Sequence, residues 1–231
     1  IYYVDEVLNG YSKGYLTMLM GVLLVSQLLG MLVFGPIMTK TSKKATILIG
    51  APIRIVCTLG LLAFSYEGAP IAPILALSAG VGIGNAATLT SIFAILADMA
   101  DVDELITSVS RPGIVSGMAT FARKISAGIS AWVIGILISF AGYDAGIAKA
   151  GLRQSLHTQN GIAMIFILPV ILVTLLLIFG YMFPITKKEF ELVHKEIARR
   201  KGEDDSVATE EEKNILKRVT GIEYEQLWGN K

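Results

Sequence analysis

Five long stretches almost free of charge restrict this chain to folds that a lipid bilayer can hold. Three of them contain no Asp, Glu, Lys or Arg, namely 14–39, 68–97 and 154–186. In the other two, the charged residues are all basic: 45–66 contains Arg54, and 112–143 contains Arg123 and Lys124. A hydrocarbon core about 30 Å thick takes roughly 20 helical residues, and backbone groups in lipid must bond within their own segment. The sequence therefore predicts an all-α membrane protein with five spans.

The composition excludes several other classes of protein. A hydrophobic content of 53% and a mean hydropathy of +0.62 exceed what a soluble globule buries. A net charge of +1 gives no reason to expect nucleic acid as a partner. One cysteine and two histidines exclude a disulfide framework and leave little for a zinc site. No nucleophile or metalloprotease motif occurs. We predict no enzyme, no cofactor and no metal.

Basic residues in the short loops predict the orientation in the cell membrane. Ten of them, at Lys40, Lys43, Lys44, Arg111 and six positions between Lys187 and Lys201, fall on one side, and three fall on the other. Because Lys and Arg accumulate in cytoplasmic loops, this distribution predicts a cytoplasmic C-terminus. We divide the chain into three parts: 1–13 as the end of a preceding helix with an outer loop, 14–186 as the transmembrane bundle, and 187–231 as a charged cytoplasmic tail. The predicted spans are 14–39, 45–66, 69–97, 113–143 and 160–184.

Five spans that begin outside and end inside predict that the chain is the C-terminal part of a larger protein. The tail combines ten basic and eleven acidic residues in 45. Such a segment is typically solvated, so we expect some helix there but no separate core.

The fourth span carries two cations near its middle. At 100° per residue, Lys124, Arg123 and Thr120 share about 160° of arc with three serines, and large apolar side chains occupy the opposite arc. A cation at mid-bilayer costs on the order of 3 kcal/mol, so it usually faces a cavity or an anionic partner. Lys124 and Thr120, one turn apart, are candidate solute ligands. A structural ion pair, or a side chain that reaches the interface, is the alternative for Arg123, Lys124 and the isolated Arg54.

The third span adds polar side chains in its centre and acids at its end. Asn85 falls within about 140° of arc with Ser78, Thr88 and Ser91, which is compatible either with a solute cavity or with hydrogen bonds between helices. Asp98, Asp101 and Glu104 follow one helical edge beyond the span. Carboxylates at a helix C-terminus oppose its dipole, so we expect partners such as Arg111, Lys43 or Lys44. The cluster is either a salt-bridged cytoplasmic gate or a solvated surface group.

Several of these segments resemble one transporter family. They are Ala97-Asp98-Met-Ala-Asp101-Val-Asp-Glu104, Arg111-Pro-Gly113-Ile, Phe121-Ala-Arg-Lys124, Gly142-Tyr143, Tyr2-Tyr3 and Thr186-Lys-Lys-Glu-Phe-Glu. Together they resemble the glycoside-pentoside-hexuronide:cation symporters, to which the melibiose permease belongs. The likeness covers nearly the whole chain and corresponds to the C-terminal half of a twelve-helix transporter of the major facilitator type.

The resemblance implies roles for particular residues. It places Lys124 and Thr120 beside the sugar and cation sites, and it makes Asp98, Asp101 and Glu104 part of an inner gate. Val102 stands where many members have an aromatic residue, and Leu89 stands where the melibiose carrier has a tryptophan. These departures imply an altered sugar platform and a different substrate. The acids that bind sugar and cation in the family belong to the N-terminal half, so the coupling sodium or proton is expected to bind mainly there.

These observations predict a secondary transporter that couples a cation to the uptake of a sugar or glycoside by alternating access. The predicted substrate-binding residues are Lys124, Thr120, Arg123, Asn85 and Leu89. The predicted gate residues are Asp98, Asp101, Glu104 and Arg111. The expected partners are the solute, the lipid bilayer and the N-terminal half. A carrier of a lysolipid or an organic anion on the same scaffold is one alternative, and a membrane scaffold subunit without transport is another.

Overall fold

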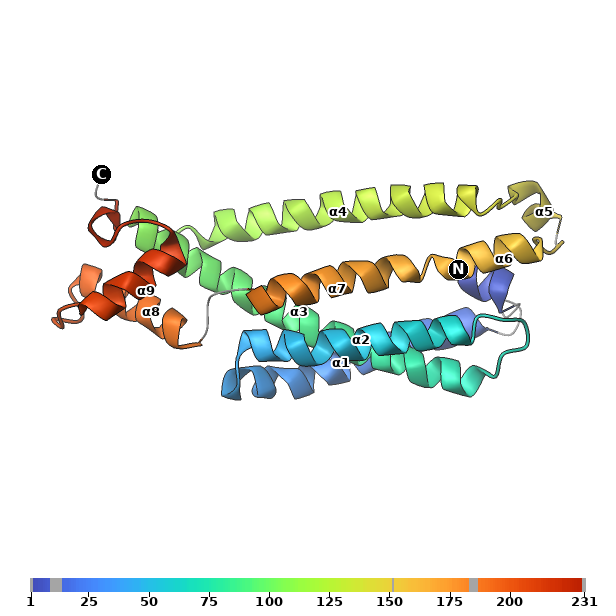
Figure 1. Cartoon of the computed structure of the whole chain (residues 1–231), viewed down its shortest axis with the longest axis horizontal. Helices are drawn as coiled ribbons and strands as arrows, with labels where there is room; N and C mark the ends of the chain where they lie inside the picture. Colours follow the sequence, from blue (N-terminus) through green and yellow to red (C-terminus); the bar gives the residue numbers. More distant parts are fainter. Residues whose placement is uncertain (1, 9–13, 151, 183–186, 230–231) are drawn as a thin grey trace.

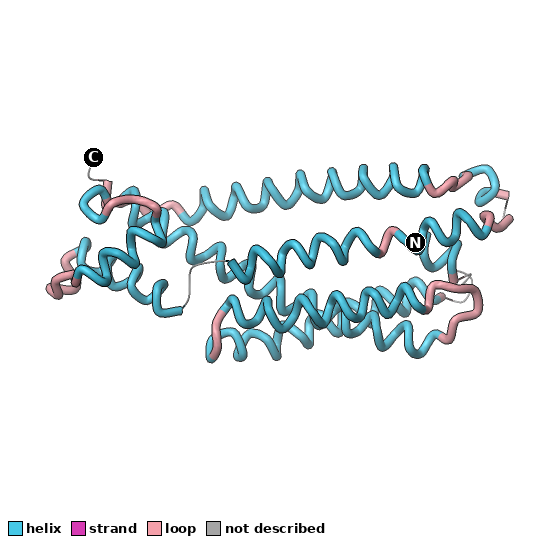
Figure 2. Tube along the Cα trace, viewed as in Figure 1, coloured by secondary structure: helices cyan, strands magenta, loops and turns pink. Residues whose placement is uncertain are grey.

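The computed structural model describes residues 2–8, 14–150, 152–182 and 187–229, which are helical or connect helices, with no strand among them (Figures 1 and 2). A helical turn, η1 (Tyr3–Val7), precedes α1 (Tyr15–Lys40), α2 (Lys43–Ala63), α3 (Ile71–Thr107) and α4 (Pro112–Phe140). Then follow α5 (Ala145–Lys149), α6 (Leu156–Met164), α7 (Ile167–Met182), α8 (Lys187–Lys201), α9 (Glu210–Thr220) and the turn η3 (Tyr224–Gln226). The predicted loop residues 9–13, the last two residues of the predicted fifth span and Thr186 lie outside the described residues.

Five helical segments in the described residues are long and apolar enough to cross a membrane: α1, α2, α3, α4 and the combined α6–α7. This result confirms the predicted all-α membrane fold. The ends differ from expectation at two places. Helix α3 continues ten residues past the predicted end at Ala97, so at 1.5 Å per residue it is about 55 Å long and extends well beyond the lipid.

The other difference is a break between α6 and α7. Pro169 has no N–H to bond to the carbonyl of Ile165, and the chain there makes shorter-range bonds, such as Leu168 N–H to Ile165 O at 3.1 Å. The predicted single span is therefore two helices joined by a tight turn.

Helices α1, α2 and α3 form the packed part of the membrane region. Small residues allow their backbones to approach: a Cβ built on Gly84 would lie 2.7 Å from the carbonyl oxygen of Gly50, and one on Gly82 would lie 2.7 Å from the carbonyl oxygen of Leu23. Contacts between membrane helices commonly depend on such small residues. Helix α7 packs against α2.

Helix α4 stands apart from this bundle. It contacts α3 near the turn that joins them and α6 near its far end, and in Figure 1 it runs along the upper edge of the molecule. Its central residues, 120–132, are exposed on every face, and a Cβ on Gly117 or Gly128 would meet nothing within 4 Å.

The tail folds onto the end of α3, on the left in Figure 1. Its side chains form a hydrophobic cluster with α3: Val102, Leu105, Val193, Ile197, Leu216 and Leu227. The backbone N–H groups of Trp228 and Gly229 donate to the carbonyls of Leu105 and Ile106, both at 2.9 Å. We expected a solvated tail, whereas α8 and α9 share a core with α3. The four tail residues of the cluster are spread over 35 positions among many charged residues, so the sequence does not group them into a recognisable core.

Candidate functional site

The three predicted ligands on α4 lie near the middle of that helix. Lys124 is the thirteenth of its 29 residues, and Thr120, Arg123 and Lys124 are all exposed. Among the described residues, none makes a side-chain hydrogen bond or ion pair with these three. Two cations and a hydroxyl therefore lie together near the middle of this candidate membrane span, without a side-chain partner in the described chain.

Asn85 lies in the packed bundle, where it connects three helices. Arg54 on α2 donates from Nη1 to Asn85 Oδ1 at 3.1 Å, and Asn85 Nδ2 donates to Gln27 Oε1 on α1 at 3.0 Å. All three side chains are half-buried. Gln27 is residue 13 of 26 in α1, and Arg54 is residue 12 of 21 in α2, so this chain of polar groups lies near the middle of the bundle. Leu89 follows one turn after Asn85 and is half-buried.

Sequence reasoning missed Gln27 and treated Arg54 as an isolated cation. The signal was present, because Gln27 is the one carboxamide in the uncharged stretch 14–39. Two polar residues on different helices cannot be paired from one sequence, however. Their register depends on the close approach of α2 and α3 at Gly84, where an added Cβ would lie 2.8 Å from Cβ of Arg54.

The acids at the end of α3 have partners on other helices. Lys43, at the start of α2, forms an ion pair with the largely buried Asp98 and donates to the carbonyl of Ala94 at 3.2 Å. Asp101 approaches His194 Nε2 at 3.6 Å, and Glu104 pairs with Lys201 Nζ at 2.6 Å. Of the cations expected from the sequence, Lys43 is found at this edge. The tail helix α8 supplies the two other partners.

Arg111 pairs with a carboxylate at the end of α3, as expected, but with Asp103 and not with the predicted gate residues Asp98, Asp101 or Glu104. Its Nε and Nη2 groups donate to the two oxygens of Asp103, with three N–O distances from 2.9 to 3.1 Å. Asp103 precedes Arg111 by eight residues, so the pair closes the α3–α4 turn. The short turn brings Asp103 within hydrogen-bonding distance of the guanidinium of Arg111.

A cavity of about 350 Å³ lies beside Asp98 and Lys43, at the junction of α1, α2, α3 and α8. Its lining residues are Met38, Thr39, Ser42, Lys43, Asp98, Lys187, Phe190 and Glu191. The ammonium of Lys43 lies 4.7 Å from the centre of the Phe190 ring, a cation–π contact. This wall thus combines the α2–α3 ion pair with an aromatic residue of the tail.

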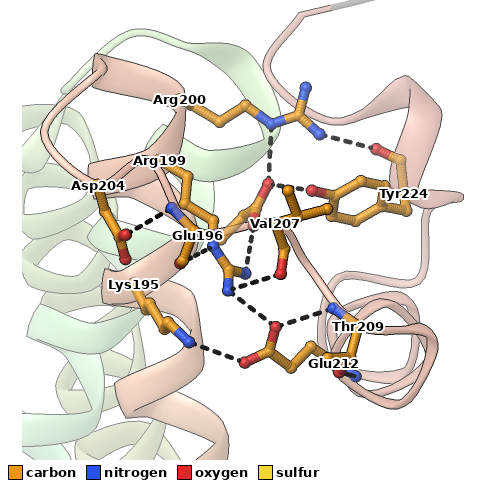
Figure 3. A network of polar contacts seen from close by, with 10 residues as sticks. Lys195, Glu196, Arg199, Arg200, Asp204, Val207, Thr209, Glu212 and Tyr224 are labelled. Atoms are coloured by element: carbon orange, nitrogen blue, oxygen red, sulfur yellow. Dashed lines mark hydrogen bonds and ion pairs between the residues drawn. The ribbon is translucent and has the colours of Figure 1, made fainter.

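A second polar network holds the tail together (Figure 3). Glu196, fully buried, accepts bonds from Arg199, Arg200 and the hydroxyl of Tyr224 at 3.2, 2.9 and 2.7 Å. Glu212 accepts bonds from the Thr209 N–H, Lys195 and Arg199 at 3.1, 3.1 and 2.9 Å. These three donors lower the pKa of Glu212 to about 2, and the Thr209 N–H has the largest effect. The tail is therefore a folded unit and not a loose chain.

No group of three or more His, Cys, Asp or Glu side chains within the described ranges has the geometry of a metal site. The membrane part contains two exposed cations on α4, a polar chain across α1, α2 and α3, and ion pairs at the end of α3. Comparison with known protein families identifies one match. The family described as MFS/sugar transport protein matches residues 1–187. The chain belongs to this family.

Two curated relatives come from Escherichia coli (strain K12). A glucuronide carrier protein homolog is 27% identical over 206 residues, which covers 87% of this chain and 42% of the relative. A putative sulfoquinovose importer is 30% identical over 224 residues, covering 91% of this chain and 43% of the relative. The chain therefore spans less than half the length of these relatives. No solved structure matches it.

Proposed function

We propose that this chain is one of the two helical bundles of a secondary active transporter, which carries a sugar or glycoside across the cell membrane together with a cation. The observation that carries the proposal is the pair of cations on α4, which are exposed at mid-depth and have no partner among the described residues. Burying such charged groups in lipid costs free energy. A water-filled path that receives a solute would remove this cost.

The exposed surface of α4 favours a second bundle facing it. The polar arc of Lys124, Arg123, Thr120 and the serines borders no other described helix at the centre of α4, and the relatives are more than twice as long as this chain. Two bundles that rock about a midplane site would open the path to each side in turn. The coupling sodium or proton would bind mainly on the other bundle, because no carboxylate lies at mid-depth in the sequence of the five spans.

The solute we favour is a sugar that carries an acidic group. The relatives are named for a glucuronide and for sulfoquinovose, which bear a carboxylate and a sulfonate respectively. The mid-depth charges of this chain, at Arg54, Arg123 and Lys124, are all positive, so an anionic solute would neutralise part of them. A cationic solute would be repelled.

The ion pairs at the end of α3 would form the cytoplasmic gate. Lys43–Asp98 joins α2 to α3, and Glu104–Lys201 joins α3 to the tail. The basic residues around these pairs favour a cytoplasmic position for this end of the bundle and for the C-terminus. Opening towards the cytoplasm would break contacts of this kind and expose the cavity beside Lys43.

Replacing Lys124 tests the proposal. In membrane vesicles that contain the whole transporter, we expect Lys124→Ala to lower gradient-driven uptake of a radiolabelled glucuronide by about 100-fold, the effect of losing a hydrogen bond to a charged group. The amount of protein in the membrane should not change. Lys149→Ala, on exposed α5, is the control and should transport normally. Undiminished coupled uptake by Lys124→Ala would contradict the proposal.

A further inference from the structure

The chain of hydrogen bonds from Arg54 through Asn85 to Gln27 has a fixed direction. A guanidinium donates and never accepts, so the group that faces Arg54 on Asn85 must be the carbonyl oxygen, 3.1 Å away. The NH₂ group of Asn85 then points to α1 and donates to the carbonyl oxygen of Gln27 at 3.0 Å. Arg54 therefore determines the orientation of both amides.

Because of this direction, most of the hydrogen-bonding capacity left over belongs to donors. Each of the two amide oxygens accepts one bond within the network and keeps one free lone pair. The second N–H of Asn85, both N–H groups of Gln27 and most N–H groups of Arg54 have no partner in the described part of the chain. Such a surface, with a guanidinium behind it, favours an anionic ligand that accepts several hydrogen bonds.

Arg54 also lacks a counter-charge in this chain at its own depth. Residues 14–97 contain a single acid, Glu67, which lies beyond the end of α2 and pairs with Arg153. The acids of α3 begin at Asp98, more than three turns after Asn85. Since an unpaired guanidinium at mid-bilayer is costly, an anion from outside these helices is the remaining source of charge.

We propose that Gln27, Asn85 and Arg54 form a donor-rich subsite for the acidic group of an anionic sugar. Asn85 and Gln27 donate directly to the carboxylate or sulfonate. Arg54 is a positioning residue that fixes the two amides and supplies positive charge behind them. The subsite lies on α1, α2 and α3, separate from the cations of α4. It rests on the proposed transport function and assigns the feature of the solute that is read.

Two probe solutes isolate the acidic group. 4-Nitrophenyl β-D-glucuronide and 4-nitrophenyl β-D-glucoside differ at one carbon, which bears a carboxylate in the first and a hydroxymethyl group in the second. The subsite predicts that the whole transporter in proteoliposomes takes up the glucuronide with the lower KM.

Asn85→Asp is the decisive variant. It keeps the size of the side chain and the bond from Arg54, but it replaces the donating NH₂ group by an accepting oxygen. We expect the KM for the glucuronide to rise roughly 10- to 100-fold, the range for a hydrogen bond to a charged group, and the KM for the glucoside to stay within about threefold. Gln27→Met should raise the KM for the glucuronide by a smaller factor, because it removes one donating NH₂ group and adds no charge.

The matched control is Thr88→Val, one turn from Asn85. The hydroxyl of Thr88 is buried and donates to the carbonyl of Gly84 in its own helix at 3.0 Å, so neither KM should change. Arg54→Met tests the positioning role and should raise the KM for the glucuronide alone. A purely structural role for Arg54 would instead lower the amount of folded protein and leave the ratio of the two KM values unchanged.

The possible results separate the two proposals. Uptake of both solutes with an unchanged KM ratio in Asn85→Asp and Gln27→Met overturns the subsite and leaves the transport function standing. An equal rise of both KM values in Arg54→Met shows that Arg54 does not act selectively on the acidic group, which also overturns the subsite. No uptake of either solute by the unaltered transporter overturns the transport function and, with it, the subsite.

Discussion

The α1–α3 bundle and helix α4 differ in whether the polar groups near the middle of their spans have partners within the described residues. In the bundle, Arg54, Asn85 and Gln27 bond to one another across three closely packed helices. On α4, Arg123 and Lys124 are exposed and have no partner among the described residues. In the bundle, hydrogen bonds between packed helices fix the orientation of the groups that we propose to receive the acidic group of the solute. On α4, the proposed water-filled path accommodates the charges.

The largest expected effect comes from adding volume to the packed region. Gly84→Leu would place a side chain against the backbone of Gly50, whose carbonyl oxygen lies 2.7 Å from the position of the first added carbon. Overpacking of this kind costs about 1–3 kcal/mol or more, and we expect the midpoint of thermal unfolding in detergent to fall by several degrees.

Gly135→Leu is the matched control on α4, where no atom lies within 4 Å of an added Cβ. It should leave the unfolding midpoint unchanged. Equal destabilisation by the two substitutions would remove the contrast between a packed bundle and a free helix.

A smaller effect distinguishes the two kinds of ion pair at the end of α3. Asp98→Asn should destabilise the protein by about 1–3 kcal/mol, because it removes the largely buried negative charge that pairs with the ammonium of Lys43. Asp103→Asn removes a pair that is about one-third exposed on both sides, so its effect should be at most about 1 kcal/mol. Denaturant unfolding of the two variants measures the difference. A larger loss for Asp103→Asn would show that the α3–α4 turn, and not the contact between α2 and α3, holds this end together.

The smallest effect concerns the tail and depends on pH. The pKa of Glu212 is lowered to about 2 from its ordinary value of 4.5, so its contribution to the stability of the tail is complete above pH 4.5 and is lost as pH falls towards 2. Trp228 reports on the tail cluster, and Trp132→Phe removes the other tryptophan of residues 1–231. Any tryptophan of the other bundle is replaced by Phe as well. The fluorescence of Trp228 should shift over this pH range in Trp132→Phe, and the shift should be reduced when Glu212→Gln is added. An identical acid transition in both proteins would show that Glu212 does not stabilise the tail.

Sequence alone predicted the five membrane segments because charge is excluded from lipid, and that rule needs no tertiary information. It also predicted Lys43 as a partner of the acids. It did not predict the Asp103–Arg111 pair, the bonds to Gln27 or the tail cluster. Each of these depends on which residues of different elements meet, and Val102, Val193 and Leu216 share no periodic pattern that would group them. The break at Pro169 had a local signal, and the long apolar stretch around it obscured that signal.

On the transport proposal, the polar arc of α4 borders a solute path filled with water. Cysteine accessibility in the whole transporter tests this, in a background where Cys57 and any cysteine of the other bundle are replaced by alanine. Thr120→Cys lies on the arc, and Ile129→Cys lies opposite it on the same helix. We predict that a water-soluble maleimide labels Thr120→Cys in membranes at least tenfold faster than Ile129→Cys, and that a transported glucuronide slows only the first reaction. Equal, solute-independent labelling of the two positions would contradict the account.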